Sequence, residues 1–261
     1  RRLTANDGAA TRWCRHGAAA IILADEKFHD RAMTSTIGTS AERIAGAIAA
    51  ELAALPHPSL ADLRAVRRRW SSALRAEAPD AALAVAEALT GTPAPRFLAY
   101  EVALHHPGAI ALVDADAAER LAGRLASWGE VDAFATLVAG PAWLGGRVSD
   151  ADVMGWAASG DRWWRRAALV ATTGLNVPSR GGHGDAPRTI AVCERLVGDR
   201  DDTVVKALSW ALRELVRHDP DAVARFLEEH AGDMAPRVRR EVTAKLTTGL
   251  KQGWRSGRDV D

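Results

Sequence analysis

The chain has 261 residues, and its 34 Lys and Arg residues nearly balance 33 Asp and Glu residues, so its formal net charge is +1. That balance argues against a strongly basic nucleic-acid-binding arm, and the longest apolar run, residues 17–24, is too short to span a bilayer. Cys14 and Cys193 lie far apart without metal-ligand spacing, which argues against a disulfide scaffold and indicates a reducing, cytoplasmic location.

Residues 1–32 show no helical period, and Met33 opens a segment typical of a natural start. We therefore expect 1–32 to be an upstream extension or a loosely packed tail. It does not resemble a signal peptide, because charged residues follow its short apolar run where a cleavage site would stand. The expected organisation is this extension, one helical-repeat domain at residues 33–250, and a frayed tail at 251–261.

From Ser40 onward the chain is rich in strong helix formers, and its apolar residues recur at intervals of three and four. Caps and breakers divide it into short helices. In chain order, the predicted helices are 41–55, 60–78, 81–89, 96–105, 117–127, 128–138, 150–158, 162–173, 188–197, 203–218, 220–229 and 237–246. Turns are predicted at residues 90–93 and at Gly140–Pro141, and a thirteen-residue loop at 175–187.

These short helices fall into pairs that recur every 35–45 residues or so, which is the spacing of HEAT-type repeats. None is long enough to be stable alone, so neighbouring pairs have to bury one another's apolar stripes. The predicted fold is all-α, an α-solenoid of about six HEAT-like pairs with a concave face that binds DNA. Sequence similarity between the repeats is weak, so the prediction depends on helix pairing.

Three segments contain residue types that can carry chemistry. In the first, SWGEVD, Trp128 and Asp132 are four residues apart and share one face of a helix. Taken alone, this spacing favours a tryptophan at the edge of the core beside a solvated carboxylate.

The second segment, RWWRRAAL, begins at Arg162. Two adjacent tryptophans diverge on a helix, so one points inward and the other lies near the surface. Arg165 and Arg166 next to them are either solvated residues of a helix start or phosphate contacts. Spacing alone favours the solvated reading.

The third segment, KALSWALRE, centres on Trp210, with Lys206 one turn before it and Arg213 about one turn after it. By itself it predicts a core tryptophan on an amphipathic helix.

Other motifs are weaker. The run Arg67–Trp70 is typical of a solvated helix face, and His105 and His106 diverge on a helix with no third metal ligand nearby. The Gly-rich residues 180–185 lack the strand–loop–helix context of a nucleotide-binding loop. We therefore predict neither a metal site nor a nucleotide cofactor.

Taken together, and in the same order, the three segments resemble the DNA alkylation repair glycosylases of the AlkD type over residues 58–246 or so. The resemblance implies that Asp132, Trp128 and Trp210 form the catalytic site. It implies that Arg166 contacts DNA, and we add Arg165, Lys206 and Arg213 as neighbouring DNA-binding residues. The loop at 175–187 is longer than in the best-known members, which leaves the substrate range open.

The resemblance implies a monomeric enzyme without a cofactor that excises cationic N3- and N7-alkylpurines from double-stranded DNA without flipping the base out of the stack. The charge distribution is compatible with DNA: residues 1–80 and 161–261 each carry +3, whereas 81–160 carry −5. Two alternatives remain open, a non-catalytic HEAT scaffold that binds DNA or protein and a paralogue specialised for bulky natural-product adducts.

Overall fold

A computed structural model describes residues 38–250 of the protein. The predictions for the extension at 1–32 and for the tail at 251–261 lie outside these residues. All regular elements in the described part are helices, which confirms an all-α protein. After a helix at residues 38–53 they are α2 (Leu60–Leu74), α3 (Pro79–Thr90), α4 (Arg96–His105), η1 (Ala109–Leu112), α5 (Ala115–Ala122), α6 (Trp128–Phe134), η2 (Ala135–Ala139), α7 (Gly140–Leu144), α8 (Asp150–Ala157), α9 (Arg162–Asn176), η3 (Pro178–Arg180), α10 (Ala186–Leu196), α11 (Asp202–Leu215), α12 (Pro220–Glu229) and α13 (Pro236–Thr248).

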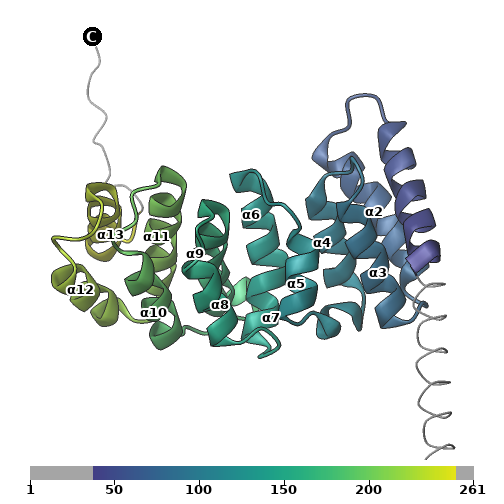
Figure 1. Cartoon of the computed structure of the whole chain (residues 1–261). Helices are drawn as coiled ribbons and strands as arrows, with labels where there is room; N and C mark the ends of the chain where they lie inside the picture. Colours follow the sequence, from purple (N-terminus) through teal and green to yellow (C-terminus); the bar gives the residue numbers. More distant parts are fainter. Residues whose placement is uncertain (1–37, 251–261) are drawn as a thin grey trace, which may run out of the picture.

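The helices form two rows (Figure 1). One row, which we call the α9 row, consists of α2, α4, α6, α9, α11 and α13, and each of these helices packs against its neighbours in the row. The other row contains α3, α5, α8, α10 and α12. Pairs such as α3 with α4, α8 with α9 and α10 with α11 connect the rows. The predicted solenoid of about six helix pairs is confirmed.

Side-chain caps begin the helices that matter most below. Ser127 accepts a hydrogen bond from the backbone N–H of Glu130 at the start of α6, and Asp161 accepts one from Trp163 at the start of α9. Asp201 does the same for Thr203 at the start of α11. These caps satisfy N–H groups that have no partner within the helix, so they determine which residue occupies each turn.

The predicted turn at Gly140–Pro141 is wrong. The chain stays helical there, passing from α6 through the π-helical turn η2 into α7. Pro141 follows directly after this π-helical turn, in the first turn of α7. A Cβ on Gly140 would lie 3.1 Å from the carbonyl oxygen of Ala171 and 3.2 Å from the Cα of Gly174. Glycine is used here for a close approach to α9 rather than for a turn.

The predicted helix at 117–127 is also too long, because α5 ends before Gly123, whose φ of 50° leaves the right-handed helical region. By contrast, α9 continues three residues past its predicted end at Thr173 and shortens the predicted loop.

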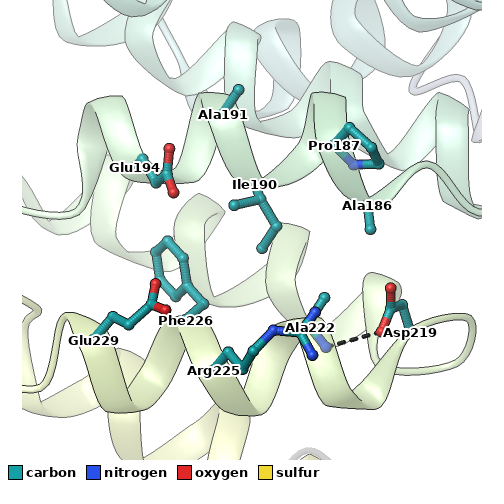
Figure 2. A pocket seen from close by; sticks show the side chains of 10 residues that line it. All are labelled: Ala186, Pro187, Ile190, Ala191, Glu194, Asp219, Ala222, Arg225, Phe226 and Glu229. Atoms are coloured by element: carbon teal, nitrogen blue, oxygen red, sulfur yellow. Dashed lines mark hydrogen bonds between the residues drawn. The ribbon is translucent and has the colours of Figure 1, made fainter.

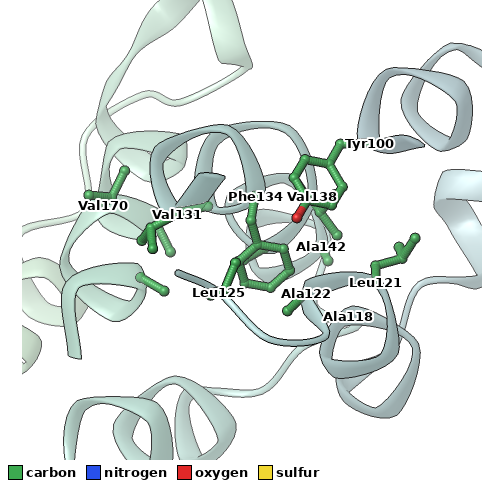
Figure 3. Packing of buried hydrophobic residues seen from close by; sticks show 14 of the residues in the cluster. Tyr100, Ala118, Leu121, Ala122, Leu125, Val131, Phe134, Val138, Ala142 and Val170 are labelled. Atoms are coloured by element: carbon green, nitrogen blue, oxygen red, sulfur yellow. The ribbon is translucent and has the colours of Figure 1, made fainter. Parts of the chain in front are cut away.

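The middle of the core is built around Phe134 of α6 (Figure 3). Edge-on aromatic contacts join its ring to Tyr100 at 5.9 Å, Trp156 at 6.2 Å and Trp164 at 5.8 Å between ring centroids. These contacts connect α4, α6, α8 and α9 and anchor α6, whose exposed end carries the candidate site.

Candidate active site

Asp132 lies one turn after Trp128 on α6, as its spacing predicts. Trp128 occupies the first turn beside the Ser127 cap and is 67% exposed, which is unusual for so large an apolar side chain. The Asp132 carboxylate is only 20% exposed. The first turn of α6 therefore presents an open indole and the next turn a partly shielded carboxylate.

Arg166 of α9 binds the Asp132 carboxylate with a two-pronged fork. Its Nε donates to Oδ1 at 2.9 Å and its Nη2 donates to Oδ2 at 2.8 Å. The Arg166 side chain is 8% exposed. Such bidentate pairs fix both the position and the rotation of the carboxylate.

Arg166 also reaches the third helix of this cluster. Its Nη1 donates to the backbone carbonyl oxygen of Thr203, in the first turn of α11, at 2.5 Å. That turn is held by Asp201, which accepts hydrogen bonds from both the N–H and the hydroxyl of Thr203. Burial raises the pKa of Asp201, but the hydrogen bonds from Thr203 and Val204 and the charge of Arg162 together outweigh it and keep this pKa below its usual value. One buried guanidinium thus ties together α6, α9 and α11.

Trp210 lies seven residues after Thr203, on the same face of α11. It is partly buried against the core rather than enclosed in it, and its indole N–H donates to Glu214 Oε1 at 3.2 Å. The structure brings Asp132 and Arg166 into direct contact. It places Trp128 and Trp210 on the helices on either side of α9 in the same row.

The other residues predicted to bind DNA lie on α9 and α11 and make contacts within the protein. Arg165 donates to Asp199 at 2.7 Å and to two backbone carbonyls, and Lys206 pairs with Asp202 at 2.6 Å. Arg213 donates to the backbone and hydroxyl oxygens of Ser209, and burial lowers its pKa. Their contacts with DNA stay predictions.

Two residues near the site were missed by the sequence analysis. Glu214 was visible as the residue one turn after Trp210, but its bond to the indole was not foreseen. Arg180 was considered only as part of a Gly-rich loop. Burial lowers the pKa of Arg180, and the negative charges of Glu214 and Asp132 oppose that shift, so its guanidinium lies in the field of both carboxylates.

Within residues 38–250, no group of three His, Cys, Asp or Glu residues is arranged to hold a metal ion. The same part of the chain contains no helix of the length and hydrophobicity that crossing a membrane requires. A hollow of about 360 Å³ opens between α10 and α12 in the other row (Figure 2). Ile190, Arg225 and Phe226 lie in its wall, and none of the predicted site residues lines it.

Comparison with protein families gives a match that covers the site. No curated protein and no solved structure matches the chain. Residues 59–246, most of the chain, match the family described as DNA alkylation repair enzyme. The matched region begins beside α2, ends within α13, and includes the Asp132–Arg166 pair with both flanking tryptophans. The chain therefore belongs to the DNA alkylation repair enzyme family.

Proposed function

We propose that this protein is a DNA glycosylase that hydrolyses the N-glycosidic bond of cationic N3- and N7-alkylated purines in duplex DNA. The observation that carries the proposal is the Asp132 carboxylate, held by the Arg166 fork and reachable from solvent beside an exposed tryptophan. A carboxylate so positioned suits a reaction in which positive charge develops on a sugar.

The positive charge of the substrate base reduces the catalytic work that the enzyme has to do. An alkylpurine such as 7-methylguanine already carries a positive charge, so it leaves as a neutral base when the C1′–N bond breaks, and no general acid has to protonate it. The sugar becomes an oxocarbenium-like cation. Asp132 stabilises this cation and orients the water that adds to C1′.

Arg166 holds the Asp132 carboxylate in a fixed position and rotation for this role. Three of its five N–H donors are engaged by Asp132 and by the Thr203 carbonyl, so Arg166 is in the first place a positioning residue for the carboxylate. Two donors remain for the phosphate contact that the family resemblance implies, and the salt dependence of DNA binding tests that contact.

Trp128 and Trp210 supply aromatic faces for the lesion. A cationic base or sugar over an indole gains about 0.5–2 kcal/mol, and a neutral purine gains less. The exposure of Trp128 supports this role, because its ring is open to an incoming ligand. A lesion held between such faces need not be fully extruded from the duplex, which would accommodate bulky adducts. The enzyme acts as a monomer in the cytoplasm, without a cofactor.

The decisive experiment incubates the protein with duplex DNA treated with a methylating agent and measures free 3-methyladenine and 7-methylguanine by chromatography. Parallel samples contain the Asp132→Asn variant and no protein, because alkylpurines are also lost spontaneously. Release well above both controls supports the glycosylase. DNA binding without release would instead favour the non-catalytic scaffold. A second substrate with a bulky N7 adduct separates a general enzyme from a specialised paralogue.

A further inference from the structure

The segment between α9 and α10 has a defined structure, which its glycines and hydrogen bonds support. Gly181 has a φ of 86° and closes the η3 turn, and Gly184 has a φ of 93° and donates its N–H to the carbonyl oxygen of Leu175 at 3.0 Å. A Cβ on Gly182 would lie 2.5 Å from the backbone of Leu175. Each of these glycines therefore permits a conformation or a contact that a side chain would prevent.

Asn176, the last residue of α9, completes the anchor. Its side-chain oxygen accepts the N–H of Asp185 at 3.0 Å, and its amide group donates to the hydroxyl of Thr189 at 2.8 Å. The ring of His218 meets the Asn176 carbonyl at 2.6 Å. Residues 177–185 thus fold back onto α9 in one defined conformation. This conformation fixes the backbone position from which the Arg180 side chain extends.

The side chain of Arg180 contacts the face of α9 that carries Arg166. Its Nη1 donates to the hydroxyl of Thr173 at 2.7 Å, and Thr173 lies seven residues after Arg166, on the same face of α9. Glu214, which holds the indole of Trp210, and Asp132 both act on the Arg180 charge. The side chain thus borders the proposed site on the side of α11.

The arginine is partly buried, yet among the described residues it forms no ion pair, and its hydrogen bond to Thr173 uses one of five donors. Arg165 and Arg166, by contrast, both bind carboxylates. A cation that is shielded from water usually has an anionic partner. The unused donors of Arg180 form a planar fork of the kind that binds phosphate.

We propose that Arg180 is a phosphate contact of this enzyme, which binds the DNA backbone where it passes the Asp132 site. This inference rests on the proposed function. It also bears on the charge of the site. Arg166 already compensates Asp132, whereas Glu214 contacts the neutral indole of Trp210 and forms no ion pair among the described residues. The positive charge of Arg180 offsets the repulsion between Glu214 and a phosphate and lets the strand approach.

The test measures binding of the full-length protein to undamaged duplex DNA across a series of salt concentrations. Arg180→Met removes the charge but keeps an apolar stem, and Arg225→Met is the matched control, because Arg225 is exposed on α12 in the other row. Loss of one phosphate contact lowers the slope of log affinity against log salt by about 0.9. When salt rises from 50 to 200 mM, the affinity of the wild type should therefore fall by a factor about 3.5 times larger than the factor for Arg180→Met.

Arg225→Met should keep the wild-type slope, and so should Arg180→Lys, which retains the charge. Equal slopes for Arg180→Met and Arg225→Met would overturn the proposal. If Arg180→Met melts at a lower temperature than the wild type, Arg180→Gln gives the same comparison with a polar, uncharged side chain. Base release is measured separately: a lower slope without release retains the phosphate contact and rejects the glycosylase, whereas release with an unchanged slope rejects the contact alone.

Discussion

The α9 row contains two similar ion pairs with different surroundings. Between α2 and α4, Glu101 accepts hydrogen bonds from Arg64 and Arg67, both at 2.9 Å, and its side chain is only 6% exposed. Between α6 and α9, Asp132 accepts the Arg166 fork at similar distances but is 20% exposed. The first carboxylate is closed off by two arginines. The second keeps a route to solvent beside Trp128.

This difference teaches that a carboxylate–arginine pair between neighbouring helices is a general way of joining repeats, and that access makes one of them a candidate site. Glu101 has no exposed tryptophan one turn before it, because residue 97 is a phenylalanine in contact with the Arg64 guanidinium. Four substitutions test the contrast, in order of decreasing expected effect.

Asp132→Asn is expected to have the largest effect. The amide keeps one acceptor for Arg166 but removes the negative charge that stabilises the sugar cation, so release of 7-methylguanine should fall by about 100- to 1,000-fold. The buried Arg166 loses its charged partner, so the free energy of unfolding should also fall by about 1–3 kcal/mol, and release is therefore measured per folded molecule. DNA binding should change little. Wild-type release by this variant would eliminate Asp132 as the catalytic carboxylate.

Arg166→Met should come next. The carboxylate then loses the fork that orients it, and misplacement of a reacting group reduces the rate by about 10- to 100-fold. Single-turnover release, measured at saturating enzyme, separates this effect from weaker binding. The salt slope of binding should also fall by about 0.9 if Arg166 contacts a phosphate. An unchanged slope would leave only its positioning role.

Glu101→Gln tests the closed pair. It leaves two arginines without a charged partner, and we expect a loss of about 1–3 kcal/mol in the free energy of unfolding, with the partly exposed Arg64 keeping the loss at the lower end. Chemical denaturation measures it. Base release per folded molecule should stay at the wild-type level, and a selective loss of activity would show that the two pairs are not functionally distinct.

Trp128→Ala should have the smallest effect. Because the ring is mostly exposed, its removal should cost little stability, whereas release of cationic bases should fall by about 2- to 30-fold through the lost cation–π contact. Trp143, which is 2% exposed, is the contrasting position, where truncation to Ala should destabilise the fold by about 3–5 kcal/mol. Unchanged release by Trp128→Ala would remove the indole from the site.

Much of this arrangement can be predicted from local signals. Helices are predicted to begin at residues 128, 162 and 203, and α6, α9 and α11 begin at Trp128, Arg162 and Asp202. The four-residue spacing places Trp128 and Asp132 on one face. These features are predictable because a helix begins where its free N–H groups find a side-chain acceptor, and because its period determines which residues share a face.

Gly140 and Arg180 have structural roles that such local signals do not predict. Gly140 next to a proline is typical of a turn, but the close crossing of α7 over α9 keeps the chain helical. Nothing in a glycine-rich loop shows that it folds back onto α9 and places an arginine against Thr173.

By itself, then, the sequence determined an all-α chain of paired helices, their starting points, and the residues that resemble a repair glycosylase. Only the tertiary structure decided that Asp132 is held by Arg166, that Trp128 stays open, and that Arg180 packs on the face of α9 that carries Arg166. The physical reason is that helix formation depends on neighbours within four residues, whereas these contacts connect residues more than thirty positions apart or depend on what packs around them.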